Sequence, residues 1–80
     1  MEIDKKQLPI LEFLVWGTET NSVKEAVEFI DKNAMWDDLI SSLNNPQIWK
    51  IGTKANKTNI LEITDYYSTV TAKDLESGAA

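Results

Sequence analysis

The carboxylates are the side chains in this sequence best suited to acid–base or metal chemistry, because Cys, His and Arg do not occur in it. Without imidazole and thiol groups, zinc sites and His-based or Cys-based catalysis have no residues to use. Asp37 and Asp38 are adjacent, and adjacent helical residues point about 100° apart, so these two do not converge on one substrate. They suit the first turn of a helix, where the helix dipole favours negative charge. We therefore predict no enzymatic activity, with no catalytic residue, no metal site and no cofactor.

A second set of carboxylates recurs every third residue, at Glu25, Glu28 and Asp31. On a helix this spacing forms an acidic ridge with a rise of about 4.5 Å per step. A calcium loop would need an Asp-x-Asp-x-Asp-Gly pattern, and the sequence contains none. The ridge is either a solvated outer face or a negative strip that meets a basic partner. We take these three residues as candidate contacts to another protein.

Aromatic residues are frequent for a chain of 80 residues, with three Trp and two Tyr. Trp and Tyr are preferred anchors of protein interfaces. We expect Trp16 and Trp36 in the core, because they lie in apolar stripes, and Trp49 to point inward as well. Tyr66 and Tyr67 are adjacent, and in an extended chain they would point to opposite faces, which leaves one exposed. Both tyrosines therefore join the candidate partner-binding residues.

Three lysines, Lys50, Lys54 and Lys57, form the main positive region of the sequence. On a hairpin they would allow an alternative function, contact with nucleic-acid phosphates. The formal net charge of −5 disfavours nucleic acid and anionic membranes as partners. The predicted second helix also lacks lysine, so it is a poor recognition helix.

The first half of the sequence predicts one ambiguous element and two helices. Residues 8–16 are almost wholly apolar, and periodicity does not decide between helix and strand in so short a run. Pro9 suits a first helical turn, but Phe, Val and Trp before Gly17 favour a strand at 11–17. Ser22 and Glu25 predict a capping box that begins a helix. The apolar stripe slips near Asn33, which predicts a break and a second helix from Trp36 to Leu43.

After Pro46 the spacing of the apolar residues changes from that of a helix to that of a strand. Residues 48–51 and 59–64 resemble strands, and the polar segment 52–58 between them is typical of a turn. This pattern predicts a hairpin with a long loop. Thr71 and Asp74 would cap a short helix over 72–77.

Together these elements predict an α+β fold, in which a small antiparallel sheet, made of the first strand and the C-terminal hairpin, packs against two helices. The alternative is a three-helix domain resembling a winged helix, if residues 8–16 are helical. We expect a single small domain over residues 1–80, with flexible ends at 1–7 and 77–80. An unpaired sheet edge would also allow a homodimer by strand addition.

No segment approaches the ~20 apolar residues of a membrane helix, and a cytoplasmic location is expected. The functional prediction is a small acidic, non-enzymatic protein-binding module, such as a phage or bacterial inhibitor or adaptor. The segment Thr71-Ala-Lys-Asp-Leu-Glu-Ser-Gly-Ala-Ala also looks like the end of leaders in precursors of modified ribosomal peptides. This resemblance implies a further alternative, a precursor or carrier chain processed by a maturation enzyme.

Overall fold

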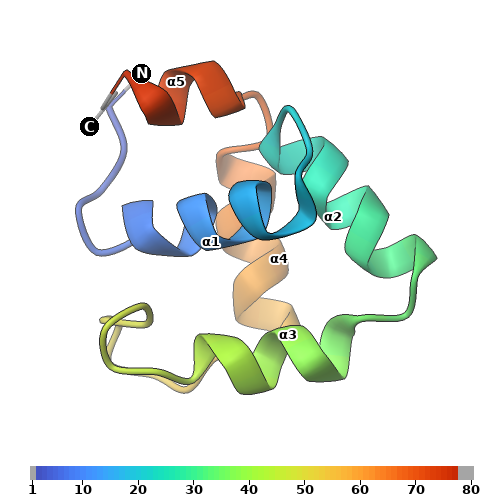
Figure 1. Ribbon diagram of the computed structural model, residues 1–80. Helices are drawn as coiled ribbons and strands as arrows, with labels where there is room; N and C mark the ends of the chain where they lie inside the picture. The colour runs from blue at the N-terminus through green and yellow to red at the C-terminus, as the bar shows by residue number, and fades with distance from the viewer. Residues whose placement is uncertain (1, 78–80) are drawn as a thin grey trace.

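The protein is helical over the part of the chain that the structure describes, residues 2–77. The computed structural model contains five helices over this range: α1 (Leu8–Thr18), α2 (Val23–Lys32), α3 (Trp36–Leu43), α4 (Lys57–Tyr66) and α5 (Ala72–Glu76). In Figure 1, α1 crosses the middle of the molecule, α4 passes behind it, and α5 and α3 lie above and below. The β pairing within residues 2–77 is limited to an isolated bridge between Ser22 and Thr71. The predicted α+β fold with an antiparallel sheet is therefore wrong, and the sheet edge proposed for a strand-added homodimer does not form here.

The first predicted strand, at residues 11–17, is part of α1. Pro9 stands in the first turn of this helix, where a missing backbone N–H costs nothing. Ile10, Leu11, Leu14 and Val15 are all buried, and their spacing makes one apolar stripe along a helix. This burial outweighs the strand preference of Phe, Val and Trp. The winged-helix alternative was right about these residues, but residues 48–64 do not form the hairpin that its wing requires.

The second and third predicted strands do not form a hairpin. Residues 48–51 lie in the loop between α3 and α4, and residues 59–64 lie within α4. The Asn56 side chain accepts the Asn59 N–H at 2.9 Å and so caps the start of α4. Ile60 and Ile63 are buried on the inner side of this helix. A strand would have placed these two residues on opposite faces.

The two helices predicted in the first half are confirmed. Ser22 caps α2, because its Oγ accepts the Glu25 N–H at 3.1 Å. The Glu25 carboxylate accepts the Asn21 N–H at 3.0 Å, one residue earlier than in a full capping box. The expected break near Asn33 is also present, since Ala34 has a φ of 52° and turns the chain into α3.

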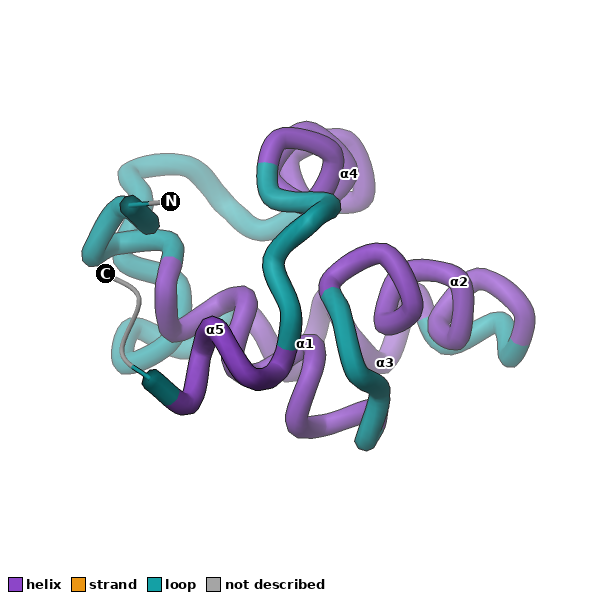
Figure 2. The backbone as a smooth tube through the Cα atoms, turned by 90° about the horizontal axis from the view of Figure 1, so that it is seen from above, coloured by secondary structure: helices purple, strands orange, loops and turns teal. Residues whose placement is uncertain are grey.

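The core lies where α1 to α4 meet, as the view from above shows (Figure 2). Its largest fully buried side chains come from all four of these helices: Ile10, Leu11, Leu14, Ile30, Leu43 and Ile60. Trp49 is buried as expected, although it lies in a loop, and its indole N–H donates to the Thr53 carbonyl. Trp36 is half-buried against the core. The core prediction for Trp16 is wrong, because 49% of this residue is exposed.

Asn44 ties together the two ends of the loop between α3 and α4. Its Oδ1 accepts the Ala55 N–H at 3.0 Å, and its Nδ2 donates to the Ile40 carbonyl at 3.1 Å. Ala55 is buried. One side chain therefore fixes the point where the loop returns to the body of the protein and turns into α4.

The C-terminal helix is anchored beside the start of α2. Val23 N–H donates to the Val70 carbonyl at 2.9 Å, and Ala72 N–H donates to the Asn21 carbonyl at 2.8 Å. The capping box of Thr71 with Asp74 is confirmed at the start of α5. Of the ends expected to be flexible, residues 1 and 78–80 lie outside the described residues, whereas Ile3 packs in the core.

Candidate functional site

Helix α4 presents an inner apolar side and an outer side that mixes acidic and apolar groups. Ile60, Ile63 and Thr64 face inward and are buried, and the Thr64 hydroxyl donates to the Ile60 carbonyl at 2.9 Å. On the outer side, Leu61 is 38% exposed and Tyr66 is 74% exposed. Single exposed apolar side chains are common on protein surfaces, so the groups around these two decide whether they form a site.

The two adjacent tyrosines have different surroundings. Tyr67 is buried, and its hydroxyl accepts the Asp4 N–H at 3.2 Å. The ring of Tyr66 meets the ring of Tyr67 edge-on, with the centroids 4.8 Å apart. Edge-to-face contact is a preferred arrangement of aromatic rings. The buried tyrosine therefore supports the exposed one, and the expectation that one of the pair is exposed is confirmed.

Three shallow hollows adjoin the outer side of α4 and share residues. One of about 170 Å³ lies between α2 and α4 and is lined by Glu28, Leu61 and Asp65. The next includes Leu61, Glu62 and Asp65, and the third includes Glu62 and Tyr66. Because neighbouring hollows share lining residues, the surface is continuous. We call it the α4 face and define it by Glu28, Leu61, Glu62, Asp65 and Tyr66.

The α4 face is negatively charged. Glu28, Glu62 and Asp65 belong to it, and Asp4 lines the hollow beside Tyr66. Among the described residues that line the three hollows, Lys24 is the single base. A negative surface around two exposed apolar groups favours a positively charged partner and repels a negatively charged one.

The other predicted acidic contacts have partners inside the protein. Glu25 helps to cap α2 through Asn21. Asp31 accepts the indole N–H of Trp36 at 3.2 Å and so braces the turn between α2 and α3. Of the five predicted partner-binding residues, Glu28 and Tyr66 are both exposed and line a hollow beside α4, each a different one.

The lysine group predicted for nucleic acid is not on a hairpin. Lys50 and Lys54 lie exposed in the loop between α3 and α4, and Lys57 begins α4. The Lys57 ammonium lies 5.2 Å from the centroid of the Trp36 ring, within the range of a cation–π contact. The predicted Lys-bearing hairpin is therefore wrong, because Asn56 starts a helix where the second strand was expected.

No group of three or more acidic side chains within residues 2–77 is arranged to hold a metal ion. Over the same residues, no helix is long and apolar enough to cross a membrane.

No family model, curated protein or solved structure matches the chain. The surface itself is therefore the basis for assigning a function.

Sequence reasoning missed Leu61, Glu62 and Asp65 as site residues. In a strand, Leu61 and Glu62 point to opposite faces, whereas in α4 both line one hollow. The sequence signal that would have found them is Asn56 followed by Ile60 and Ile63, because a capping residue before apolar residues at helical spacing predicts a helix. Once 57–66 is taken as a helix, the exposed acidic and apolar residues fall on its outer side.

Proposed function

We propose that this protein is a non-enzymatic protein-binding module whose α4 face holds a basic segment of another protein. The proposal is supported by one observation above all. Two exposed apolar side chains, Leu61 and Tyr66, lie on a continuous surface whose charged groups are mostly carboxylates. The partner segment would carry one or two apolar side chains for these positions, with Lys or Arg beside them.

The geometry of Tyr66 favours binding. Its ring is exposed and meets the buried ring of Tyr67 edge-on, a contact that restricts part of its motion before a partner arrives. Immobilising a free side chain at an interface costs about 0.5–1.5 kcal/mol. A supported tyrosine avoids part of this cost and provides a large contact surface.

The carboxylates have a different part in the proposal. Glu28 and Asp65 line the hollow between α2 and α4 together with Leu61 and Lys24. Charges at the edge of an interface mainly raise the association rate and exclude partners of the same sign. Such a module would act as an inhibitor or adaptor in the cytoplasm, covering or bridging a basic surface.

The experiment is a selection of displayed 12-residue peptides on the wild-type protein, followed by binding measurements on synthetic copies of the winners. We expect winners that combine Lys or Arg with Leu, Ile or an aromatic residue, and whose affinity falls as salt is raised. Replacing Leu61 and Tyr66 together by Ser should weaken binding by about tenfold or more, since an anchor residue contributes over 1 kcal/mol.

A matched control is Phe29→Ser. Phe29 is 40% exposed, close to the value for Leu61, and does not line any of the three hollows. This variant should bind the selected peptides as the wild type does. Winners without basic residues, or winners that bind equally well to the Leu61→Ser/Tyr66→Ser variant, would refute the proposal.

A further inference from the structure

A groove between α1 and α3 lies away from the α4 face. Seen from above, α4 is on one side of the molecule and α1 and α3 are on the other (Figure 2). The groove contains a pocket of about 170 Å³. We call it the α1–α3 groove and define it by Phe13, Gly17, Met35, Asp38 and Leu39.

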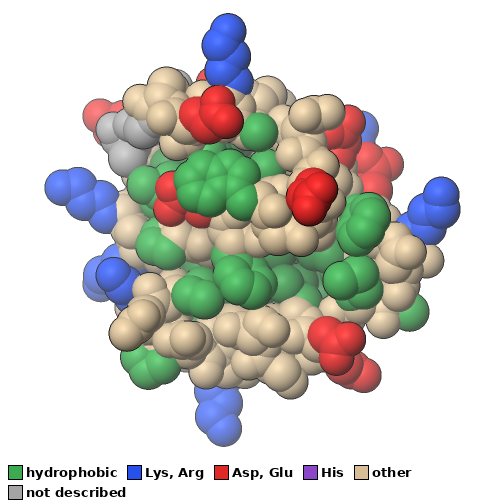
Figure 3. All heavy atoms as spheres, in the orientation of Figure 1, with side chains coloured by type: hydrophobic (Ala, Val, Ile, Leu, Met, Phe, Trp, Pro, Cys, Tyr) green, Lys and Arg blue, Asp and Glu red, His purple; other side chains and the backbone are tan. Residues whose placement is uncertain are grey.

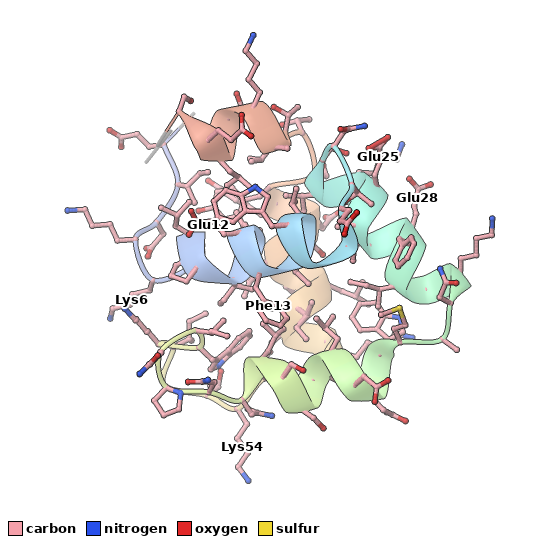
Figure 4. All side chains as sticks on the ribbon, viewed as in Figure 1. Lys6, Glu12, Phe13, Glu25, Glu28 and Lys54 are labelled. Atoms are coloured by element: carbon pink, nitrogen blue, oxygen red, sulfur yellow. The ribbon has the colours of Figure 1, made fainter. Side chains whose placement is uncertain are left out.

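The face around this groove is rich in apolar groups. Figure 3 shows hydrophobic side chains gathered over α1 and between α1 and α3, with lysines projecting from the edges of the face. In Figure 4, Phe13 points from α1 toward α3. Trp16 lies one helical turn from Phe13 on the same helix and is 49% exposed. Apolar side chains gathered on one exposed face are a common feature of interaction sites.

Gly17 is the feature that the fold itself does not explain. It is helical, and its φ is not in the left-handed region, which is taken instead by Glu19 at the end of α1. A Cβ built on Gly17 would meet no atom within 4 Å. Nothing inside the protein therefore requires glycine here, although glycine in a helix is less stable than alanine. What glycine does provide is a place where another backbone can approach closely.

The shape of the groove fits a helix as its occupant. Helices α1 and α3 run across the same face in roughly opposite directions (Figure 1). Both helices contact α2, whereas α1 and α3 have few backbone contacts with each other. A groove between two such helices accepts the apolar side of a third helix. The missing side chain at Gly17 then lets the two helix axes come close together.

Charge complementarity indicates the polar side of that helix. Asp38 is the charged residue that lines the pocket. Glu19 follows α1 directly and is exposed. Carboxylates around an apolar groove favour an occupant with Lys or Arg next to its apolar residues. A second copy of this acidic chain would place like charges together.

We propose that the α1–α3 groove binds an amphipathic basic helix of a partner protein, packed closely over Gly17 with one large apolar side chain in the pocket. This site is separate from the α4 face and does not depend on it. With both occupied, the protein would hold two basic segments on opposite sides.

The experiment uses the full chain and a displayed library of stapled helical peptides, with counter-selection on the Gly17→Leu variant. Surviving binders should carry Lys or Arg beside a bulky apolar residue. In NMR titrations they should shift the amide signals of Gly17, Asp38 and Leu39. Their affinity should fall at least fivefold for Gly17→Ala and be unchanged for Leu61→Ser/Tyr66→Ser.

Gly17→Ala separates binding from folding. Alanine is the better helix residue, so this variant should melt about 2–8 °C higher than the wild type while binding more weakly. Binders that tolerate Gly17→Ala, the recovery of only acidic or neutral helices, or the absence of any surviving helical binder would each overturn the proposal. A wild-type dimer in light scattering that Gly17→Leu abolishes would also overturn it, since a second copy would then be the occupant. None of these outcomes bears on the α4 face, which is tested separately by the peptide selection described above.

Discussion

Asn44→Ala should destabilise the protein by more than its exposed position indicates. Asn44 Oδ1 is the acceptor for the Ala55 N–H, and Ala55 is 4% exposed. A buried donor left without an acceptor costs about 1–3 kcal/mol. The lost bond from Nδ2 to the Ile40 carbonyl adds a smaller amount. We expect the free energy of unfolding to fall by about 2 kcal/mol, which lowers Tm by about 8–16 °C in a domain of this size.

The assay is urea and thermal unfolding followed by far-ultraviolet circular dichroism, together with hydrogen exchange at the Ala55 amide. Asn44→Asp keeps an oxygen acceptor for Ala55 and should recover most of the loss. Asn45→Ala is the matched control, because the Asn45 side chain accepts only the nearby Gln47 N–H, at 2.9 Å, in an exposed turn. That change should cost under about 0.5 kcal/mol.

Equal Tm values for Asn44→Ala and Asn45→Ala would contradict this role of the Asn44 side chain. An Ala55 amide that exchanges no faster in Asn44→Ala than in the wild type would contradict it as well. Either result would mean that the loop is held by Trp49 and its neighbours without help from the Asn44 amide.

Three further predictions concern other parts of the fold. Tyr67→Phe removes the acceptor for the Asp4 N–H and should cost about 0.5–1.5 kcal/mol; faster trypsin cleavage at the two lysines after Asp4 would show it, and unchanged cleavage would contradict it. Ala34→Gly should raise the free energy of unfolding by about 0.5–1 kcal/mol in urea titrations, because a φ of 52° strains any residue with a Cβ; a lower value would contradict this. Hydrogen bonds from Thr71 lower the pKa of Asp74 below its ordinary value of 3.8. The stabilisation by ionised Asp74 is therefore fully present above pH 3.8 and is lost as the pH falls through the lowered pKa. In Asp74→Asn this loss is absent, so Tm should fall less steeply on acidification than in the wild type. An unchanged curve of Tm against pH would contradict this.

Local signals in the sequence were sufficient for α2, α3 and α5. Ser22 and Thr71 are hydroxyl caps followed three residues later by an acid, and a capped start with apolar residues at helical spacing has few alternatives. The break near Asn33 could be predicted because continuing the first stripe would have buried aspartates. In α2 and α5 the cap and the periodicity favour the same structure, and in α3, which has no side-chain cap, periodicity and charge do so.

The segments that were predicted wrongly are those where period and propensity disagree. Residues 59–64 alternate apolar and polar groups over a few positions and also carry apolar groups at helical spacing. Choosing between the two patterns requires knowing which side faces the core, and that depends on α1 and α2. The candidate site was missed because residues 59–64 were predicted as a strand. A strand divides Leu61 and Glu62 between two faces, whereas in α4 both line one hollow. The exposed tyrosine was predicted correctly, because adjacent side chains point in different directions both in a strand and in a helix.

The bonds that join Asn21 and Val23 to the chain around Thr71 also bear on how the protein is made. They close a loop of about fifty residues, which costs on the order of 3 kcal/mol in chain entropy before any contact is gained. Until α5 has left the ribosome and docked, the side of α1 that contacts α5 stays uncovered. A nascent chain in which α5 has not yet docked therefore exposes apolar surface of α1 and should be the form most susceptible to proteases and aggregation.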